Sequence, residues 1–242
     1  LKFFMLLKDI SFPTPEENIL FDEVLLFLAE KGQAGEVLRF WESPVPFIVL
    51  GRTGKEEDDI YLQKAKEHHI PVLRRASGGG TGLQGKGCLN YSLVLPQNRH
   101  PGLHDIRRSY QYILGRLVTA FKSAGLEICF MPTSDLALVK ENKKFSGNAQ
   151  KRGKKFILHH GTMLYDFDLD MIEHFLKIPK DVPLYRQDRT HKDFVMNLPV
   201  NSGALKTIIR QAFGADKDSK SLADEELDCL RKFLSERKIK IY

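Results

Sequence analysis

Hydrophobic residues recur along the chain at two spacings, one typical of helices and the other of strands. From Pro15 to about Lys31 the apolar side chains form one stripe, and a proline at the first helical position favours a helix start. The segment from Ile106 to Gly125 has the same periodicity and predicts a long amphipathic helix. Short apolar runs bounded by turn residues predict strands at Leu1–Lys8, Val37–Trp41, Phe47–Leu50, Pro71–Arg75, Leu89–Leu95, Leu126–Met131, Leu136–Val139, Lys144–Asn148 and Phe156–Leu164.

Further helices and one irregular segment complete the pattern. Asp58 or Asp59 would cap a helix that runs to about His69, because an aspartate side chain accepts hydrogen bonds from the first helical N–H groups. Pro179–Asn197 is charged and irregular, so we expect an ordered loop. Within it, Tyr185–Phe194 is dense in polar groups and is expected to cover a pocket, contact the acyl-carrier domain or lie in solvent. The remaining helices are expected at Leu169–Leu176, Ser202–Phe213 and Leu222–Arg237.

Strands and helices alternate from end to end without a repeat or a low-complexity linker. This order predicts one mixed α/β domain, which we place at residues 1–200. Residues 201–242 are expected to form a helical C-terminal tail that packs on this domain.

The composition is that of a soluble globular protein, with 42% hydrophobic and 28% charged residues. No apolar run approaches the roughly 20 residues that a membrane-spanning helix needs. Cys88, Cys129 and Cys229 are far apart and form no CxxC motif, which favours a reducing, cytoplasmic location. The net charge of +6 fits an anionic ligand or an acidic protein partner. Because the basic residues are mostly dispersed, we expect no nucleic-acid partner.

A glycine-rich segment after the strand at Pro71–Arg75 is the first candidate site. It runs from Arg74 to Gly82, and backbone without Cβ atoms can approach a ligand closely and turn its N–H groups toward an anion. The two arginines suit phosphate or carboxylate contacts. The segment lacks the Lys-Ser/Thr pair of a P-loop, and its GxGxxG string at 80–85 is followed by a strand where a dinucleotide fold has a helix. A flexible hairpin without a ligand is the alternative.

A lysine on a short strand is the second candidate. Simple alternation would place Lys144 and Ser146 on one face of the strand and Phe145 on the other, while Gly147 allows a close approach or a bulge. An ammonium group held there can act on a phosphate or a developing oxyanion. From spacing alone, an exposed lysine at a strand edge is the more common explanation.

Two adjacent histidines follow on the next strand. His159 and His160 would face opposite sides of the sheet, so they cannot easily bind one metal ion, and no nearby carboxylate or cysteine pattern completes a zinc site. We therefore expect no metal centre here and one histidine facing the pocket.

These segments resemble the lipoate-protein ligase A and octanoyltransferase family. Arg74 to Gly80 is similar to its RRxSGGG signature, and Lys144 to Gln150 followed by 159–162 is similar to KxSGxA…HHGT. The resemblance extends to 18–23 and 38–41 and covers nearly the whole chain. It implies the catalytic-domain fold of biotin and lipoate protein ligases, a mixed sheet flanked by helices that is related to class II tRNA synthetases.

The resemblance also implies a reaction and its partners. Lipoate would react with Mg²⁺-bound ATP to give lipoyl-AMP, and the lipoyl group would pass to a lysine on the lipoyl domain of a 2-oxoacid dehydrogenase complex or on glycine-cleavage H protein. Lys144 would be the catalytic residue, in contact with the lipoyl carboxylate and the α-phosphate. The residues implied to bind the nucleotide or the acyl-adenylate are Arg75, Ser77, Gly78, Gly79, Gly80, Thr81, Gly82, Leu83, Asn90, Ser146, Gly147, Asn148, His160 and Gly161.

Two features depart from the family pattern. Many relatives have His-Asp where this chain has Gln84-Gly85, and only about 40 residues follow Asn201, so an accessory domain is absent or reduced and a separate accessory subunit is a possible requirement. Two other functions stay open. One is an ATP-independent octanoyl or lipoyl transferase in which Cys129 forms an acyl thioester, and the other is a non-catalytic module that binds lipoate or a nucleotide.

Overall fold

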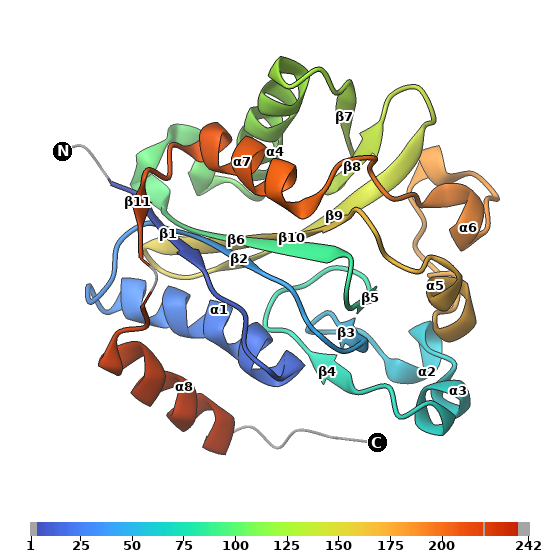
Figure 1. Ribbon diagram of the computed structural model, residues 1–242, viewed down its shortest axis with the longest axis horizontal. Helices are drawn as coiled ribbons and strands as arrows, with labels where there is room; N and C mark the ends of the chain where they lie inside the picture. Colours follow the sequence, from blue (N-terminus) through green and yellow to red (C-terminus); the bar gives the residue numbers. More distant parts are fainter. Residues whose placement is uncertain (1–3, 220, 237–242) are drawn as a thin grey trace.

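A large mixed β-sheet forms the centre of the molecule (Figure 1). The computed structural model describes residues 4–219 and 221–236. Within these residues the sheet has eight strands in the order β11-β1-β2-β6-β10-β9-β8-β7. β1 runs parallel to β2 and β11, and the other pairs are antiparallel. The strands are β1 Leu6–Asp9, β2 Val37–Trp41, β6 Cys88–Pro96, β7 Ile128–Met131, β8 Asp135–Leu138, β9 Lys143–Arg152, β10 Phe156–Leu164 and β11 Lys217–Asp218.

Helices cover both faces of this sheet (Figure 1). α4 (Ile106–Ser123) and α7 (Ser202–Phe213) pack on one face and enclose the largest hydrophobic core. α1 (Pro15–Glu30) packs on the opposite face, and α8 (Asp224–Glu236) packs on α1. The predicted architecture of a mixed sheet flanked by helices is therefore confirmed. The division into a domain at 1–200 and a tail at 201–242 stays a prediction.

Local sequence explains where α1 begins. Thr14 accepts a hydrogen bond from the backbone N–H of Glu17, and the Glu17 side chain accepts one from the backbone N–H of Thr14. This capping box satisfies two N–H groups that the helix leaves without partners, and Pro15 stands at the first helical position. The helix start is thus fixed, and with it the direction of the side chains that α1 presents to the sheet.

A second, smaller sheet lies beside the large one and has its own core. It consists of β4 (Val72–Arg74), β3 (Phe47–Leu50) and β5 (Gly82–Gln84), in that order. The glycine-rich segment connects β4 to β5, so this sheet holds both of its ends. Short helices surround it, namely α2 (Glu56–Asp59), α3 (Leu62–Glu67), α5 (Asp170–Phe175) and α6 (His191–Phe194).

Several elements differ from the sequence-based expectation. The helix expected from Asp58 or Asp59 to His69 is broken into α2 and α3 at Ile60, which is extended, 1% exposed and bridged to Leu176. Burial of this isoleucine in the second core overrides the helical pattern, and neither aspartate is the cap because Lys55 occupies that position. Pro179–Asn197 contains a 3₁₀ turn, η3 (Leu184–Arg186), as well as α6.

Other differences concern the ends of elements. Two 3₁₀ turns that were not expected, η1 (Gln97–Arg99) and η2 (Pro101–His104), precede α4, and β5 was not expected either. β9 continues to Arg152, four residues beyond the expected end. Residues 1–3 of the first expected strand and Arg237 of the last expected helix lie outside the described residues.

His159 is a core residue on the α4 side of the sheet. It is 0% exposed, and its ring nitrogens lie 3.1 Å from the Tyr91 hydroxyl and 3.0 Å from the Gln150 amide. Burial, reinforced by the charge of His160, lowers the pKa of His159 to about 3. The folded protein therefore keeps this ring neutral at pH values where the unfolded chain, with a histidine pKa of about 6.5, takes up a proton.

We expect stability to fall as the pH drops through this window. Because the pKa of His159 is lower in the folded state, its contribution is complete above about pH 6.5 and is lost as the pH falls toward 3. Between pH 6 and pH 4 the free energy of unfolding should decrease by about 1 kcal/mol per pH unit. Urea titrations of the wild type and His159→Gln measure this slope, and equal slopes in the two proteins would contradict the assignment.

Candidate functional site

A β-bulge places the motif lysine. On β8, Leu136 pairs with Ser146 and Ala137 pairs with Lys144, so β9 has one extra residue, Phe145, at this point. A bulge of this kind leaves the extra residue unpaired and breaks the strict alternation of side chains along the strand. The side chains before and after Phe145 on β9 therefore do not follow one common alternation between the two faces of the sheet.

The bulge sends Lys144 and Ser146 to opposite faces. Ser146 pairs with Met163, which lies in the core under α4, and Phe145 is buried in the same core. On the other face, the Nζ atom of Lys144 lies 3.1 Å from the position that a Cβ atom on Gly147 would take. The expectation that Lys144 and Ser146 share a face is wrong, because it assumed an unbroken alternation.

An acidic residue and a tyrosine that the sequence did not reveal hold Lys144. Nζ of Lys144 lies 2.7 Å from Oδ1 of Asp135, and the Tyr185 hydroxyl donates to Oδ2 of the same carboxylate at 2.7 Å. Tyr185 belongs to the segment between α5 and α6, and just after α6 the Met196 N–H donates to the Lys144 carbonyl on β9. Lys144 is thus half-buried with its ammonium group aligned over Gly147.

Arg74 and Arg75, the two arginines before the glycine loop, which we define as residues 76–81, bind backbone carbonyls. Arg74 donates to the carbonyls of Gly51 and Gly54 at 2.9 and 2.7 Å. Arg75 donates to the carbonyls of Gly78 and Gly80, both at 2.8 Å. Burial lowers the pKa of Arg75 to about 10, which still leaves it charged near neutral pH. Arg75 therefore fixes the loop from inside and brings a positive charge beneath its backbone.

The glycine loop lies directly on the large sheet. Gly79 has φ +90°, and a Cβ atom there would be 3.8 Å from the Cβ atom of Ala149 on β9. On the loop's other side, a Cβ atom on Gly51 would overlap the Gly79 carbonyl. Glycine is thus required at Gly79 by its left-handed backbone and at Gly51 by the close approach of the loop. Ala149 is two residues beyond Gly147, so the loop and Lys144 border the same strip of β9.

His160 links the loop to α1. Its Nε2 atom is 2.6 Å from the Ser77 hydroxyl, which also accepts a hydrogen bond from Nε of Arg75 at 3.0 Å. Its Nδ1 atom lies 3.8 Å from Oδ2 of Asp22 on α1. Neighbouring side chains on a strand point to opposite faces. Since His159 is buried on the α4 side of the sheet, His160 faces the glycine loop.

A buried ion pair supports this arrangement from below. Arg39 on β2 is 0% exposed and donates to Oδ1 of Asp22 at 2.7 Å, while the Ser92 hydroxyl donates to Oδ2 at 2.6 Å. Burial alone would raise the pKa of Asp22, but the Arg39 guanidinium and the contacts with His160 and Ser92 hold it below its ordinary value. Asp22 is therefore a carboxylate beneath the site, and its ion pair with Arg39 was not predicted.

The remaining predicted residues divide between the two faces. Thr81 donates to Asp59 at 2.5 Å, and Leu83 is buried in the second core. Asn148 accepts from the buried Tyr91 hydroxyl, and a Cβ atom on Gly161 would collide with the Asn148 side chain. Ser146, Asn148 and Gly161 thus lie on the α4 side, away from Lys144. The predicted residues gathered near the strip of β9 are Lys144, Gly147, Arg75, Ser77, Gly78, Gly79, Gly80 and His160.

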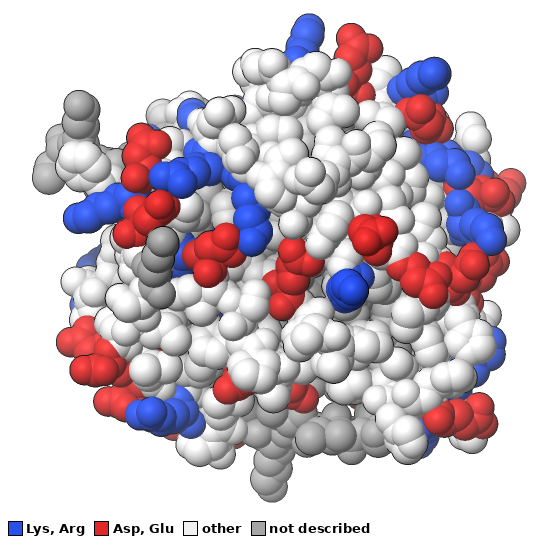
Figure 2. Space-filling model, viewed as in Figure 1, with Lys and Arg blue, Asp and Glu red and all other residues white. Residues whose placement is uncertain are grey.

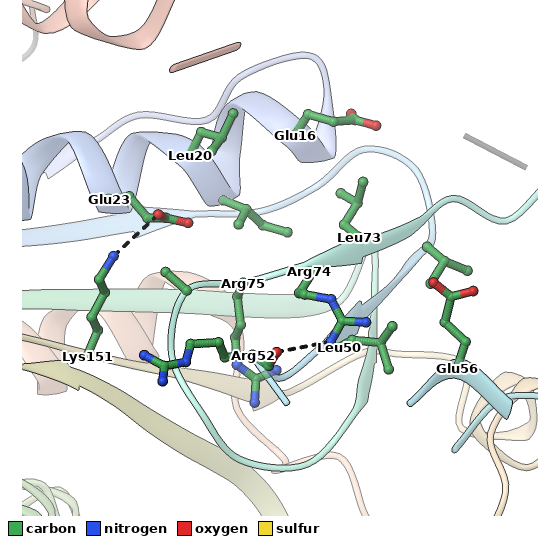
Figure 3. Close-up of a pocket in the computed structure, with 13 residues that line it drawn as sticks. Glu16, Leu20, Glu23, Leu50, Arg52, Glu56, Leu73, Arg74, Arg75 and Lys151 are labelled. Atoms are coloured by element: carbon green, nitrogen blue, oxygen red, sulfur yellow. Dashed lines mark hydrogen bonds and ion pairs between the residues drawn. The ribbon is translucent and has the colours of Figure 1, made fainter. Parts of the chain in front are cut away.

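A cavity of about 510 Å³ opens between α1 and the small sheet (Figure 3). Its apolar wall is formed by Ile19, Leu20, Leu50, Val72 and Leu73, and charged side chains stand around its rim. Lys151 of β9 points toward Glu23 of α1, with Nζ 3.6 Å from Oε2 (Figure 3). Arg52, Arg74 and Arg75 line the part of the cavity away from α1 (Figure 3). A ligand with an apolar body and an anionic end matches this distribution.

Cys129 occupies the edge strand β7. It pairs with Ala137, which in turn pairs with Lys144, so the cysteine and the lysine are on the same face, separated by one strand. The thiol is half-buried and donates to the Ala137 carbonyl at 3.6 Å, and burial raises its pKa. In this structure the thiol is therefore near the lysine but in its neutral form at physiological pH.

The face of the molecule shown in Figure 2 has no single dominant charge. Basic and acidic side chains alternate over the face in Figure 2.

Among the described residues, no helix combines the length and the apolar character needed to cross a membrane. Within the same residues, no three His, Cys, Asp or Glu side chains gather in a way that would hold a metal ion.

Comparisons with known proteins agree with the geometry. Residues 14–203 match the model of the lipoyl protein ligase A/B catalytic domain. The chain is 30% identical over 185 residues to octanoyltransferase LipM of Oceanobacillus iheyensis, an alignment that covers 69% of this chain and 67% of the relative. It is also 30% identical over 166 residues to a Mycoplasma pneumoniae protein named probable lipoate-protein ligase A, with 69% of this chain and 47% of the relative covered. The chain thus spans about half to two thirds of these relatives.

Solved structures share the fold. A bipartite lipoate protein ligase from Thermoplasma acidophilum, solved as part of a lipoylation system with an E2 lipoyl domain, superposes with a TM-score of 0.80 at 22% identity, over 97% of this chain and 92% of that one. A lipoate-protein ligase A bound with ATP gives a TM-score of 0.78 at 20% identity, over 97% and 95%. The family model matched over residues 14–203 shows that the chain belongs to the lipoyl protein ligase A/B catalytic-domain family, whose members are lipoylation enzymes.

Proposed function

We propose that the protein is an ATP-dependent lipoate-protein ligase. In the first step the lipoate carboxylate would attack the α-phosphate of ATP, forming lipoyl-AMP and releasing pyrophosphate. In the second, the amine of an acceptor lysine would attack the acyl carbonyl and release AMP. The observation that carries this proposal is that the Lys144 ammonium and the glycine loop border the same strip of β9, at Gly147 and Ala149.

The two segments suit the two ends of a mixed anhydride. Backbone N–H groups of the exposed glycines in the loop are free to bind phosphate oxygens, with the Arg75 charge beneath them. The Lys144 ammonium would offset the negative charge that develops on the α-phosphate in the transition state. Mg²⁺ would enter with ATP as part of the substrate, and the carboxylate of Asp135 beside Lys144 suits such an ion, which typically takes one or two carboxylates together with phosphates.

The cavity suits the acyl part of the substrate. Its apolar wall of α1 and small-sheet residues can bury a hydrocarbon chain, and the glycine loop forms its boundary near Arg75 and Ala76. The acceptor would be the lipoyl domain of a 2-oxoacid dehydrogenase complex or glycine-cleavage H protein. A separate accessory subunit for the first step belongs to the same proposal, since the Thermoplasma ligase of the same fold is bipartite.

A transferase is the second candidate function, and Cys129 favours it. The thiol shares a face with Lys144, and relatives at 28–32% identity are named octanoyltransferase LipM. In that reaction the thiolate would accept an octanoyl or lipoyl group from a carrier thioester and then pass it to the acceptor lysine, without ATP. The raised pKa of Cys129 opposes this function unless the approach of the Lys144 ammonium stabilises the thiolate.

Exchange of labelled pyrophosphate into ATP tests the two functions directly. We expect exchange that requires lipoate and persists in Cys129→Ser, because adenylation needs no thiol. Cys229→Ser on α8 serves as the matched control for cysteine replacement. If exchange is absent and octanoyl transfer from a carrier protein to a lipoyl domain is lost only in Cys129→Ser, the transferase is correct. If the protein binds lipoate but performs neither reaction, it is a binding module.

A further inference from the structure

The segment between α5 and α6 (residues 176–190) reaches the Lys144 ammonium group through Tyr185. The Tyr185 hydroxyl donates to Oδ2 of Asp135 at 2.7 Å, and Oδ1 of the same carboxylate lies 2.7 Å from Nζ of Lys144. Asp135 is 7% exposed, so its carboxylate has little contact with water. Each of its oxygens therefore faces one partner, and the plane of the carboxylate is fixed between the tyrosine and the lysine.

The tyrosine hydroxyl remains a donor in this position. Burial and the charge of the Asp135 carboxylate raise the pKa of Tyr185 well above its ordinary value, so the phenol stays protonated near neutral pH. An O–H group that donates to a carboxylate forms a charge-assisted hydrogen bond, which is stronger than one between neutral groups. The contact is therefore a strong constraint on the direction of Asp135.

Arg189 fixes the backbone that carries Tyr185. Its Nη1 atom donates to the Asn142 carbonyl at 2.7 Å and its Nη2 atom donates to the Tyr185 carbonyl at 2.5 Å, which ties the segment to the turn between β8 and β9. The Tyr185 ring also packs against the Phe194 ring, with 5.1 Å between the centroids. The hydroxyl is thus held in place by its backbone and by its ring, independently of Asp135.

Lys144 needs such support because its ammonium group stands on a flexible aliphatic stem. The side chain is 28% exposed, and Nζ lies 3.1 Å from the position that a Cβ atom on Gly147 would take. Gly147 in turn pairs with Asp135 across the two strands. A charged group stabilises a transition state only when it is already in place, and a displacement of about 1 Å can lower a rate about 100-fold.

We propose that Tyr185 is a positioning residue for the reaction, which directs the Lys144 ammonium toward the substrate by fixing the Asp135 carboxylate. The inference rests on one part of the proposed function, the action of Lys144 on the reacting group. Without the tyrosine hydroxyl, Oδ2 of Asp135 loses its partner, the carboxylate is free to turn, and Nζ of Lys144 follows it away from Gly147. The reactivity of Lys144 therefore depends on where the segment between α5 and α6 lies.

Tyr185→Phe removes the hydroxyl and keeps the ring that packs on Phe194. We expect kcat for modification of a purified lipoyl domain to fall about 10- to 100-fold, while KM for lipoate and for ATP stays within a few-fold, because the glycine loop and the cavity are left in place. Tyr61→Phe, at a surface position that is 41% exposed, is the matched control and should keep kcat. A loss confined to KM would contradict a positioning role.

A double-variant cycle separates positioning from a general loss of folded protein. If Tyr185 acts through Asp135, adding Tyr185→Phe to Asp135→Asn should lower kcat by less than about twofold further, because the two residues form one unit. Losses that multiply in the double variant would mean that Tyr185 acts elsewhere and would overturn the inference. Arg189→Lys, which keeps the charge but cannot bridge Asn142 and Tyr185, should lower kcat in the same direction as Tyr185→Phe.

Lys144→Met distinguishes failure of this inference from failure of the proposed function. If Lys144→Met loses activity while Tyr185→Phe keeps full kcat, the positioning role is wrong and the proposed function stands. If Lys144→Met turns over normally, both are rejected. Should the wild type transfer octanoyl groups without ATP, the same kcat ratios are measured in that assay, so the role of Tyr185 is tested although the ligase is rejected.

Discussion

Replacement of Lys144 by methionine is expected to lower the rate of lipoyl transfer by about 100- to 1000-fold, the usual effect of losing one charged group that stabilises a transition state. Methionine keeps most of the side-chain length but cannot offset charge on the α-phosphate or on an oxyanion. The loss should appear in kcat, measured as ATP-dependent modification of a purified lipoyl domain, because the ammonium group acts mainly on the transition state.

The neighbouring lysine provides the control for this experiment. Lys143 belongs to the same strand, and its Nζ atom donates to the Lys192 carbonyl at an exposed position. Lys143→Met should therefore retain activity within a few-fold. A Lys144→Met protein that is folded and turns over normally would remove this lysine from the reaction and with it the central element of the proposed mechanism.

Replacement of Arg39 by methionine should destabilise the protein by about 3–5 kcal/mol, the typical cost of leaving one member of a buried ion pair alone. Arg39 is 0% exposed and donates to Asp22, to the Asn18 carbonyl and side chain, and to the Ile10 carbonyl. Its guanidinium also lies 4.8 Å from the ring centroid of Phe21. Since domains are stable by about 5–15 kcal/mol, the loss should be visible as a lower midpoint in urea unfolding.

A double replacement separates the charge from the packing. In Arg39→Met with Asp22→Leu, both charges are gone, and apolar groups of similar size often replace a buried pair at little cost. The double variant should therefore recover a large part of the lost stability. Equal destabilisation in the single and double variants would mean that the other hydrogen bonds of Arg39, and not the unpaired carboxylate, account for the effect.

The sequence predicted the elements whose pattern is set by their own residues. The long helix at Ile106 is amphipathic along its whole length, and the glycine run could only be a loop because four glycines in five positions have no side chains to pack. The two site motifs were also found to meet, as the loop contacts Ala149 on the strand of Lys144. The helix and the loop depend on short stretches of chain, so they can be predicted from a single sequence.

The features that were not predicted from the sequence depend on contacts between residues that are far apart in the chain. The sequence allowed a bulge at Gly147, but it did not show that the extra residue is Phe145, because that depends on how β8 pairs with β9. Asp135 and Tyr185 are 50 residues apart, and they come together only because the segment after α5 folds over β9. The conformation of Ile60 also depends on a distant residue. Its burial against Leu176 breaks a helix that the neighbouring residues favour.

The position of α1 between α8 and the large sheet has a practical consequence for protein engineering. One side of α1 carries Asp22 and part of the cavity wall, while the other is covered by α8, where Phe27 and Phe233 meet edge to face at 5.6 Å. Cutting the chain before α8 would uncover the back of the helix on which Asp22 stands. Tags and truncations at this end should therefore be chosen as carefully as mutations in the glycine loop.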